Sequence, residues 1–227
     1  MHYIIILALI FLIFYFPSYW LSSMMKKYSK ESSNLTGTGR EFATYLLNKF
    51  QFDDIRVELT PEGDCYDPID KVIRLNQSYI DKKCITSIAI AAHEVGHVIQ
   101  DKKGDTIFKL RMKLIPLCNF INKLAGLLFI VSLVSTGLLK APGIALLAVI
   151  LPFLSMFFSV IVHLITLPME FDASFNKAYP IIAKGEYVEK KELKKIKKVL
   201  LAASLTYVAQ ALSQFLNISR IFRTGKK

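Results

Sequence analysis

The stretch AIAAHEVGHVIQ, residues 89–100, contains the residues whose types and spacing are most typical of chemistry. His93 and His97 are four residues apart, so on a helix both imidazole rings project from one face and can bind one metal ion. Glu94 follows the first histidine, where its carboxylate can accept a proton from a metal-bound water. This H-E-x-x-H pattern predicts a zinc-dependent hydrolase, and the alternative is a helix with two structural histidines.

A third metal ligand must come from elsewhere in the chain, because a catalytic zinc requires three protein ligands and one open position. Downstream of the motif, the candidates are His163, Glu170 and Asp172. We favour Glu170, because the segment LPMEFDAS follows an apolar segment and is expected on the same membrane side as the motif helix. His163 and Asp172 stay open as alternatives.

The helix that carries the motif is expected over residues 86–100, with Gly96 inside it. A glycine costs about 1 kcal/mol relative to alanine in an ordinary helix, so Gly96 suggests that a neighbouring backbone approaches closely. Ile55, Val57 and Leu59 alternate with other residues, which predicts a strand over residues 55–60. KVIRLN, residues 71–76, is expected to form a second strand just before this helix. The strand KVIRL is a candidate for pairing with an extended peptide substrate.

A further amphipathic helix is expected over residues 39–50, where apolar residues recur at helical spacing. Thr38 and Glu41 form a possible capping box at its start. The three cysteines are scattered without metal-like spacing and predict free, partly buried thiols; they are Cys65, Cys84 and Cys118.

The composition indicates a membrane protein, because 53% of the 227 residues are hydrophobic and the mean hydropathy is +0.39. Three apolar segments have roughly the 20-residue length of a membrane helix, at residues 3–22, 115–139 and 144–167. The last two are expected to form a hairpin that turns at KAPG, residues 140–143, and ends at Pro168. Residues 199–216 are expected to form a buried or interfacial helix, with a fourth membrane span as the alternative.

The net charge of +11 comes without any DNA- or RNA-binding motif, so nucleic acid is not an expected partner. The lysines instead follow the rule that basic residues collect in cytoplasmic loops. Lys26, Lys27 and Lys30 follow the first apolar segment, and Lys140 is the only basic residue at the hairpin tip. This pattern places the hairpin tip outside and the motif helix in the cytoplasm.

Five segments resemble those of the bacterial membrane-bound neutral zinc metallopeptidases of the YugP-like kind, and they occur in the same order. They are TGREFATYLLNKF, CYDPIDKVIRLN, AIAAHEVGHVIQ, LPMEFDAS and AASLTYVAQAL. That family is similar to the HtpX-like membrane zinc proteases, whose third ligand begins an E-x-x-x-D motif. The resemblance supports Glu170 as the ligand, but Ser174 stands where the aspartate is expected, so Asp172 becomes a candidate substitute. Cys65 stands where the YugP-like pattern has a histidine.

The resemblance implies a mainly α-helical integral membrane protein with about three transmembrane helices and a zincin-like α+β catalytic unit that contains a short β-hairpin. We expect an N-terminal transmembrane helix over residues 1–24 and a catalytic region over residues 31–113. A transmembrane hairpin is expected over residues 114–168, and a segment with the third ligand and C-terminal helices over residues 169–227.

The implied activity is that of a gluzincin-type zinc metalloendopeptidase in the bacterial cytoplasmic membrane, and the lysine pattern places its site on the cytoplasmic side. Its cofactor is Zn²⁺ held by His93, His97 and Glu170, and Glu94 is the catalytic residue. The expected partners are a protein or peptide substrate and the lipid bilayer. The alternative is a non-hydrolytic membrane scaffold or assembly factor with a retained zinc site.

Overall fold

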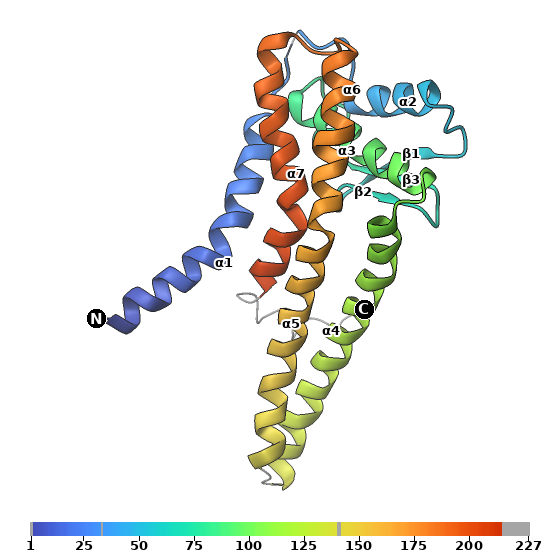
Figure 1. Ribbon diagram of the computed structural model, residues 1–227. Coiled ribbons are helices and arrows are strands. Elements are labelled where there is room, and N and C mark those ends of the chain that lie inside the picture. Colours follow the sequence, from blue (N-terminus) through green and yellow to red (C-terminus); the bar gives the residue numbers. More distant parts are fainter. Residues whose placement is uncertain (1, 33, 140–141, 215–227) are drawn as a thin grey trace. The chain divides into compact units, whose positions relative to one another are not determined.

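The computed structural model is mainly helical, with a small sheet of three strands among the described residues (Figure 1). The structure describes residues 2–32, 34–139 and 142–214, without the side chains of residues 2–14, 132–139, 142–145, 147–149, 210–211 and 213–214. The chain divides into two compact units. The motif unit comprises Tyr19–Lys109 and Leu167–Thr206, and the apolar unit contains Leu110–Thr166.

The sheet of the motif unit consists of β1 (Arg56–Thr60), β2 (Cys65–Asp67) and β3 (Val72–Asn76). β3 lies in the centre, because β1 pairs with it in parallel on one side and β2 pairs with it antiparallel on the other. Both segments predicted as strands are therefore strands, but the short hairpin is made by β2 and β3.

A tight turn holds that hairpin together. The Asp67 carboxylate accepts hydrogen bonds from the backbone N–H groups of Ile69 and Asp70, and this closes the connection from β2 to β3. The central place of β3 also corrects the prediction that KVIRL binds a peptide along its edge. Both of its edges are already paired with neighbouring strands.

Helix α2 (Gly39–Lys49) begins at the predicted capping box. The Glu41 N–H donates to the Thr38 hydroxyl, and the Thr38 N–H donates to the Glu41 carboxylate. Helix α3 (Ile85–Lys102) carries the motif, as predicted, and most of its residues are buried. Gly104 follows its end with a φ of +68°, a left-handed conformation that suits glycine.

The hydrophobic core of the motif unit surrounds α3. The helix packs against α2, β2 and β3, the π-helix η1 (Asp172–Ala178) and α6 (Tyr179–Lys184). Its fully buried side chains include Leu46 from α2, Ile73 from β3, Val95 from α3, Ile182 from α6 and Leu200 from α7 (Leu193–Gln214). The motif is thus held in a rigid core, which fixes where its side chains point.

The two apolar segments predicted at residues 115–139 and 144–167 lie in α4 (Thr106–Leu139) and α5 (Pro142–Phe171). α4 begins earlier than predicted, because the Asp105 carboxylate caps it by accepting from the N–H groups of Ile107 and Phe108.

The prediction that the second apolar segment ends at Pro168 is wrong, since α5 continues to Phe171 and then directly into η1 and α6. A proline removes one backbone hydrogen bond from a helix. The burial of the apolar Met169 side chain, which follows it, offsets this loss, because it keeps the end of α5 packed in the motif unit.

By length and composition, Thr106–Val131 and Ile150–Lys184 are long and apolar enough to cross a membrane. The predicted N-terminal span falls in α1 (His2–Lys27), where most side chains of the apolar stretch are not described, so it stays a prediction. The predicted turn at 140–143 lies partly outside the described residues, as does the end of the segment 199–216. The three cysteines are free, as expected.

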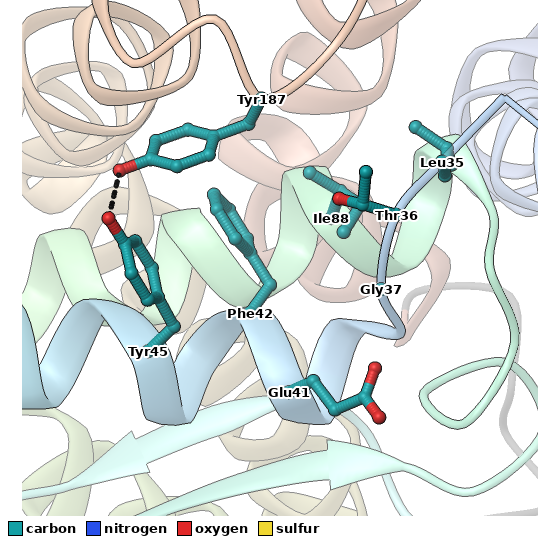
Figure 2. Close-up of a pocket in the computed structure, with 8 residues that line it drawn as sticks. All are labelled: Leu35, Thr36, Gly37, Glu41, Phe42, Tyr45, Ile88 and Tyr187. Carbon is teal, nitrogen blue, oxygen red and sulfur yellow. Dashed lines mark hydrogen bonds between the residues drawn. The ribbon is translucent and has the colours of Figure 1, made fainter.

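A cavity of about 420 Å³ in the motif unit lies beside α2 (Figure 2). Its walls are formed by Phe42 and Tyr45 of α2, by Leu35 of the preceding segment and by Tyr187, whose hydroxyl donates to that of Tyr45. None of the motif residues lines this cavity, so it is separate from the candidate metal site.

Candidate metal centre

Three buried side chains from two helices converge at the motif. His93 and His97 project from α3, and Glu170 lies in the last turn of α5. The Oε2 atom of Glu170 lies 3.3 Å from Nε2 of His93 and 3.2 Å from Nε2 of His97. All three candidate ligand atoms lie within 4.8 Å of one another. The structure therefore brings together the three residues that the sequence analysis favoured as metal ligands.

These separations fit a tetrahedral zinc site. Two ligand atoms that are each about 2.05 Å from a tetrahedral zinc lie about 3.4 Å apart. The two distances from the Glu170 oxygen agree with this value within 0.2 Å. Two imidazole nitrogens and one carboxylate oxygen are also the donor set of many catalytic zinc sites.

Burial supports the same interpretation. His93, His97 and Glu170 are 3%, 5% and 2% exposed, so the carboxylate is almost completely removed from water. Burying an ionised carboxylate costs several kcal/mol unless positive charge lies close to it. A divalent cation held between the two histidines and Glu170 would provide that charge.

The second nitrogen of each histidine ring has its own hydrogen-bond partner. Nδ1 of His93 lies 3.0 Å from the hydroxyl of Ser174, and Nδ1 of His97 lies 2.8 Å from the amide oxygen of Gln100. Both partners are almost completely buried. Such contacts hold metal-binding imidazoles in one orientation and favour one tautomer.

Glu94, the predicted catalytic carboxylate, is 4% exposed and lies on α3 beside His93. Burial raises the pKa of the Cys65 thiol, and the negative charge of Glu94 raises it further. Burial and the nearby acidic groups, Glu94 among them, likewise raise the pKa of Tyr79. The charge of Glu94 thus acts on Cys65, the first residue of β2.

Gly96 lets α3 and η1 approach closely. A Cβ atom at this position would lie only 2.8 Å from the carbonyl oxygen of Ala173 and 3.2 Å from its Cα atom. The expectation that a neighbouring backbone explains this glycine is confirmed. The π-helix begins directly after the turn that carries Glu170, and such wide turns often occur at functional sites.

The two alternative ligands occupy other places. Asp172 lies at the start of η1, where it accepts hydrogen bonds from Gln100, Lys177 and Asn176. Burial alone raises the pKa of Asp172, but these hydrogen bonds together hold it below its usual value. His163 belongs to the apolar unit, where its ring stacks on that of Tyr207.

Two aromatic rings, those of Phe108 and Tyr66, connect His97 to β2. The ring centroid of Phe108 lies 6.3 Å from that of His97, and Phe108 also stacks on Tyr66 of β2. The Tyr66 hydroxyl donates to Asp101 on α3. This hydrogen bond links β2 directly to the motif helix near the candidate metal ligands.

The sequence analysis did not anticipate the contacts of Gln100 and Ser174 with the histidines. Gln100 follows His97 by three residues, which places both side chains on one helix face. A polar side chain at this position of a buried helix was the signal that could have predicted its contact with His97. Ser174 was noted only as the residue that replaces an expected aspartate. Its contact with His93 depends on the packing of η1 against α3, which local patterns do not reveal.

Comparisons with known proteins agree with this geometry. Residues 3–225 match the model of a family described as "Putative neutral zinc metallopeptidase". The chain is also 36% identical over 221 residues to the "Putative membrane protease YugP" of Bacillus subtilis (strain 168), covering 92% of this chain and 93% of that relative. No solved structure matches the chain significantly. Since the family match spans nearly the whole sequence, the chain belongs to the neutral zinc metallopeptidase family.

Proposed function

We propose that the protein is a membrane-bound zinc metalloendopeptidase. The observation that carries this proposal is the convergence of His93, His97 and Glu170, in which the Glu170 oxygen lies at the distance from each histidine that a tetrahedral zinc site requires. Family membership and the name of the bacterial relative support peptidase activity and membrane association. The two long apolar stretches agree with insertion in a bilayer.

In this proposal the three buried side chains hold the metal, and Glu94 moves the proton. Bound zinc supplies Lewis acidity, which lowers the pKa of water towards neutrality and polarises a carbonyl group. The Glu94 carboxylate accepts a proton from the water that attacks the peptide carbon. As the carbon–nitrogen bond breaks, Glu94 passes this proton to the leaving amine.

An extended substrate is expected to pair with β2 instead of β3. Among the described strands, β1 and β2 are each paired on one side only, and β2 packs against the motif helix. The charge of Glu94, the proposed proton acceptor, acts on the thiol of Cys65, the first residue of β2. A peptide that adds to this edge uses main-chain hydrogen bonds, so it can be held without a large recognition domain.

The substitution Glu94→Gln tests the mechanism, because it removes the proton acceptor and leaves the three ligand side chains in place. We expect zinc content to stay near that of the wild type, while hydrolysis of an unfolded protein such as casein falls about 100- to 10,000-fold. Zinc is measured by atomic absorption on the full chain purified in detergent, and cleavage is measured by fluorescence of a labelled substrate.

The matched control is Glu62→Gln at an exposed position, which is expected to leave both measurements unchanged. Undiminished cleavage by Glu94→Gln contradicts the proposed role of Glu94. Wild-type protein that contains no zinc and shows no chelator-sensitive cleavage contradicts the peptidase and favours the non-hydrolytic scaffold.

A further inference from the structure

The side chain of Gln100 connects His97 to Asp172. Gln100 is 1% exposed, and its amide nitrogen donates to the backbone oxygen of Met169 and to the carboxylate of Asp172, both at 2.8 Å. A carbonyl and an ionised carboxylate only accept hydrogen bonds, so the amide nitrogen must face them. The amide oxygen therefore faces Nδ1 of His97 at 2.8 Å.

This orientation determines the tautomer of His97. An amide oxygen at hydrogen-bond distance requires a proton on Nδ1, so the lone pair of the neutral ring is on Nε2. Nε2 is the nitrogen that faces Glu170. The hydrogen bond therefore presents the metal-binding nitrogen of His97 in the form that a cation requires.

We propose that Gln100 is a positioning residue that transmits the charge of Asp172 to His97 and so fixes the tautomer and orientation of this metal ligand. The inference rests on the proposed metal site. Asp172 is itself held by hydrogen bonds from Lys177 and Asn176, so the carboxylate at the far end of the connection is fixed.

The two histidines have partners of different charge. The hydroxyl of Ser174 donates its single proton to the backbone oxygen of Leu200 at 3.1 Å, which leaves its oxygen to accept from Nδ1 of His93. His93 thus has a neutral partner. The carboxylate acts on the other histidine instead, through the amide of Gln100.

Gln100→Met tests this role, because methionine fills a similar volume but cannot accept a hydrogen bond from His97. We expect zinc affinity to fall about 10- to 100-fold, the usual effect of removing the hydrogen-bond partner of a metal ligand. The affinity is measured by competition with a chromogenic chelator, using the full chain in detergent. Gln77→Met, at an exposed position, is the control and is expected to bind zinc like the wild type.

A second pair of variants separates positioning from packing. Gln100→Glu places a carboxylate against that of Asp172, so we expect weaker zinc binding than in the wild type. Adding Asp172→Asn supplies an amide donor at position 172. Positions 100 and 172 then again carry one carboxylate and one amide, as in the wild type. The double variant is therefore expected to bind zinc more tightly than either Gln100→Glu or Gln100→Met.

These measurements distinguish the inference from the proposed function. Wild-type affinity in Gln100→Met, or a double variant no better than Gln100→Glu, overturns the positioning role while the metal site stands. Wild-type protein that does not bind zinc overturns both. Since Gln100 is buried, the comparison of the double variant with Gln100→Glu decides the question if Gln100→Met does not fold.

Discussion

At the scale of single residues, the two candidate zinc histidines are chemically different. His97 faces a buried amide that is linked to a carboxylate, whereas His93 faces a hydroxyl that is linked to a backbone carbonyl. A partner connected to negative charge strengthens the basicity of an imidazole more than a neutral partner does. The site is therefore asymmetric, and we expect its two sides to respond differently to substitution.

Ser174→Ala is expected to weaken zinc binding and to lower the stability of the metal-free protein. The change removes the acceptor for Nδ1 of His93 and one donor to the Leu200 carbonyl, which lies inside α7. A buried polar atom that loses its partner costs about 1–3 kcal/mol. Zinc affinity by chelator competition and the thermal unfolding midpoint without metal measure the two effects.

A second buried serine provides the control for this substitution. Ser204 on α7 is completely buried and donates to the Leu201 carbonyl. Ser204→Ala is expected to lower the unfolding midpoint but to leave zinc affinity unchanged. Equal loss of zinc affinity in both variants means that Ser174 acts through general stability and not through His93.

At the scale of elements, sequence patterns predicted local structure well and long-range packing poorly. The motif helix and the capping box follow from residues three or four apart, and both were predicted. β2 was missed because it is only three residues long and lies between turn-forming residues. The continuation past Pro168 into a π-helix was missed because burial against α3 outweighs a local helix-breaking signal.

The candidate site shows the same division. His93, Glu94 and His97 were recognisable from spacing alone, while Glu170 required the order of the apolar segments and a family resemblance. The hydrogen-bond partners on the far side of the rings come from η1 and from the end of α3. Their arrangement depends on how two helices pack, and that information is not present in local sequence.

Gly96→Ala tests the contact between α3 and η1. In an ordinary helix this change stabilises by about 1 kcal/mol. Here the new methyl group meets the Ala173 backbone at 2.8 Å, and backbone cannot move aside as a flexible side chain can. We expect destabilisation of about 1–3 kcal/mol and weaker zinc binding, because the helices that carry the ligands are forced apart.

Gly126→Ala is the matched control, because this glycine also lies inside a helix but has no atom within 4 Å of an added Cβ. It is expected to be neutral or slightly stabilising. The unfolding midpoint and the zinc affinity of both variants are compared with those of the wild type. Stabilisation by Gly96→Ala contradicts the close contact.

At the scale of the whole molecule, charge and apolar length together predict the orientation in the membrane. The motif unit is rich in exposed lysines at its C-terminal end, including Lys184, Lys190 and Lys194. By sequence, the turn between the two long apolar stretches has Lys140 as its only basic residue. Basic residues stay preferentially in the cytoplasm, so we propose that the motif unit, with its candidate zinc site, is cytoplasmic.

Single cysteines in place of two lysines test this orientation, in a chain whose own three cysteines are replaced. Lys184→Cys is expected to resist a membrane-impermeant maleimide in intact cells and to react after the membrane is permeabilised, because Lys184 is exposed on the motif unit. Lys140→Cys is expected to react in intact cells. The reverse pattern places the metal site outside, where its substrates would be extracytoplasmic proteins, and it means that the lysines near Lys184 do not determine the topology.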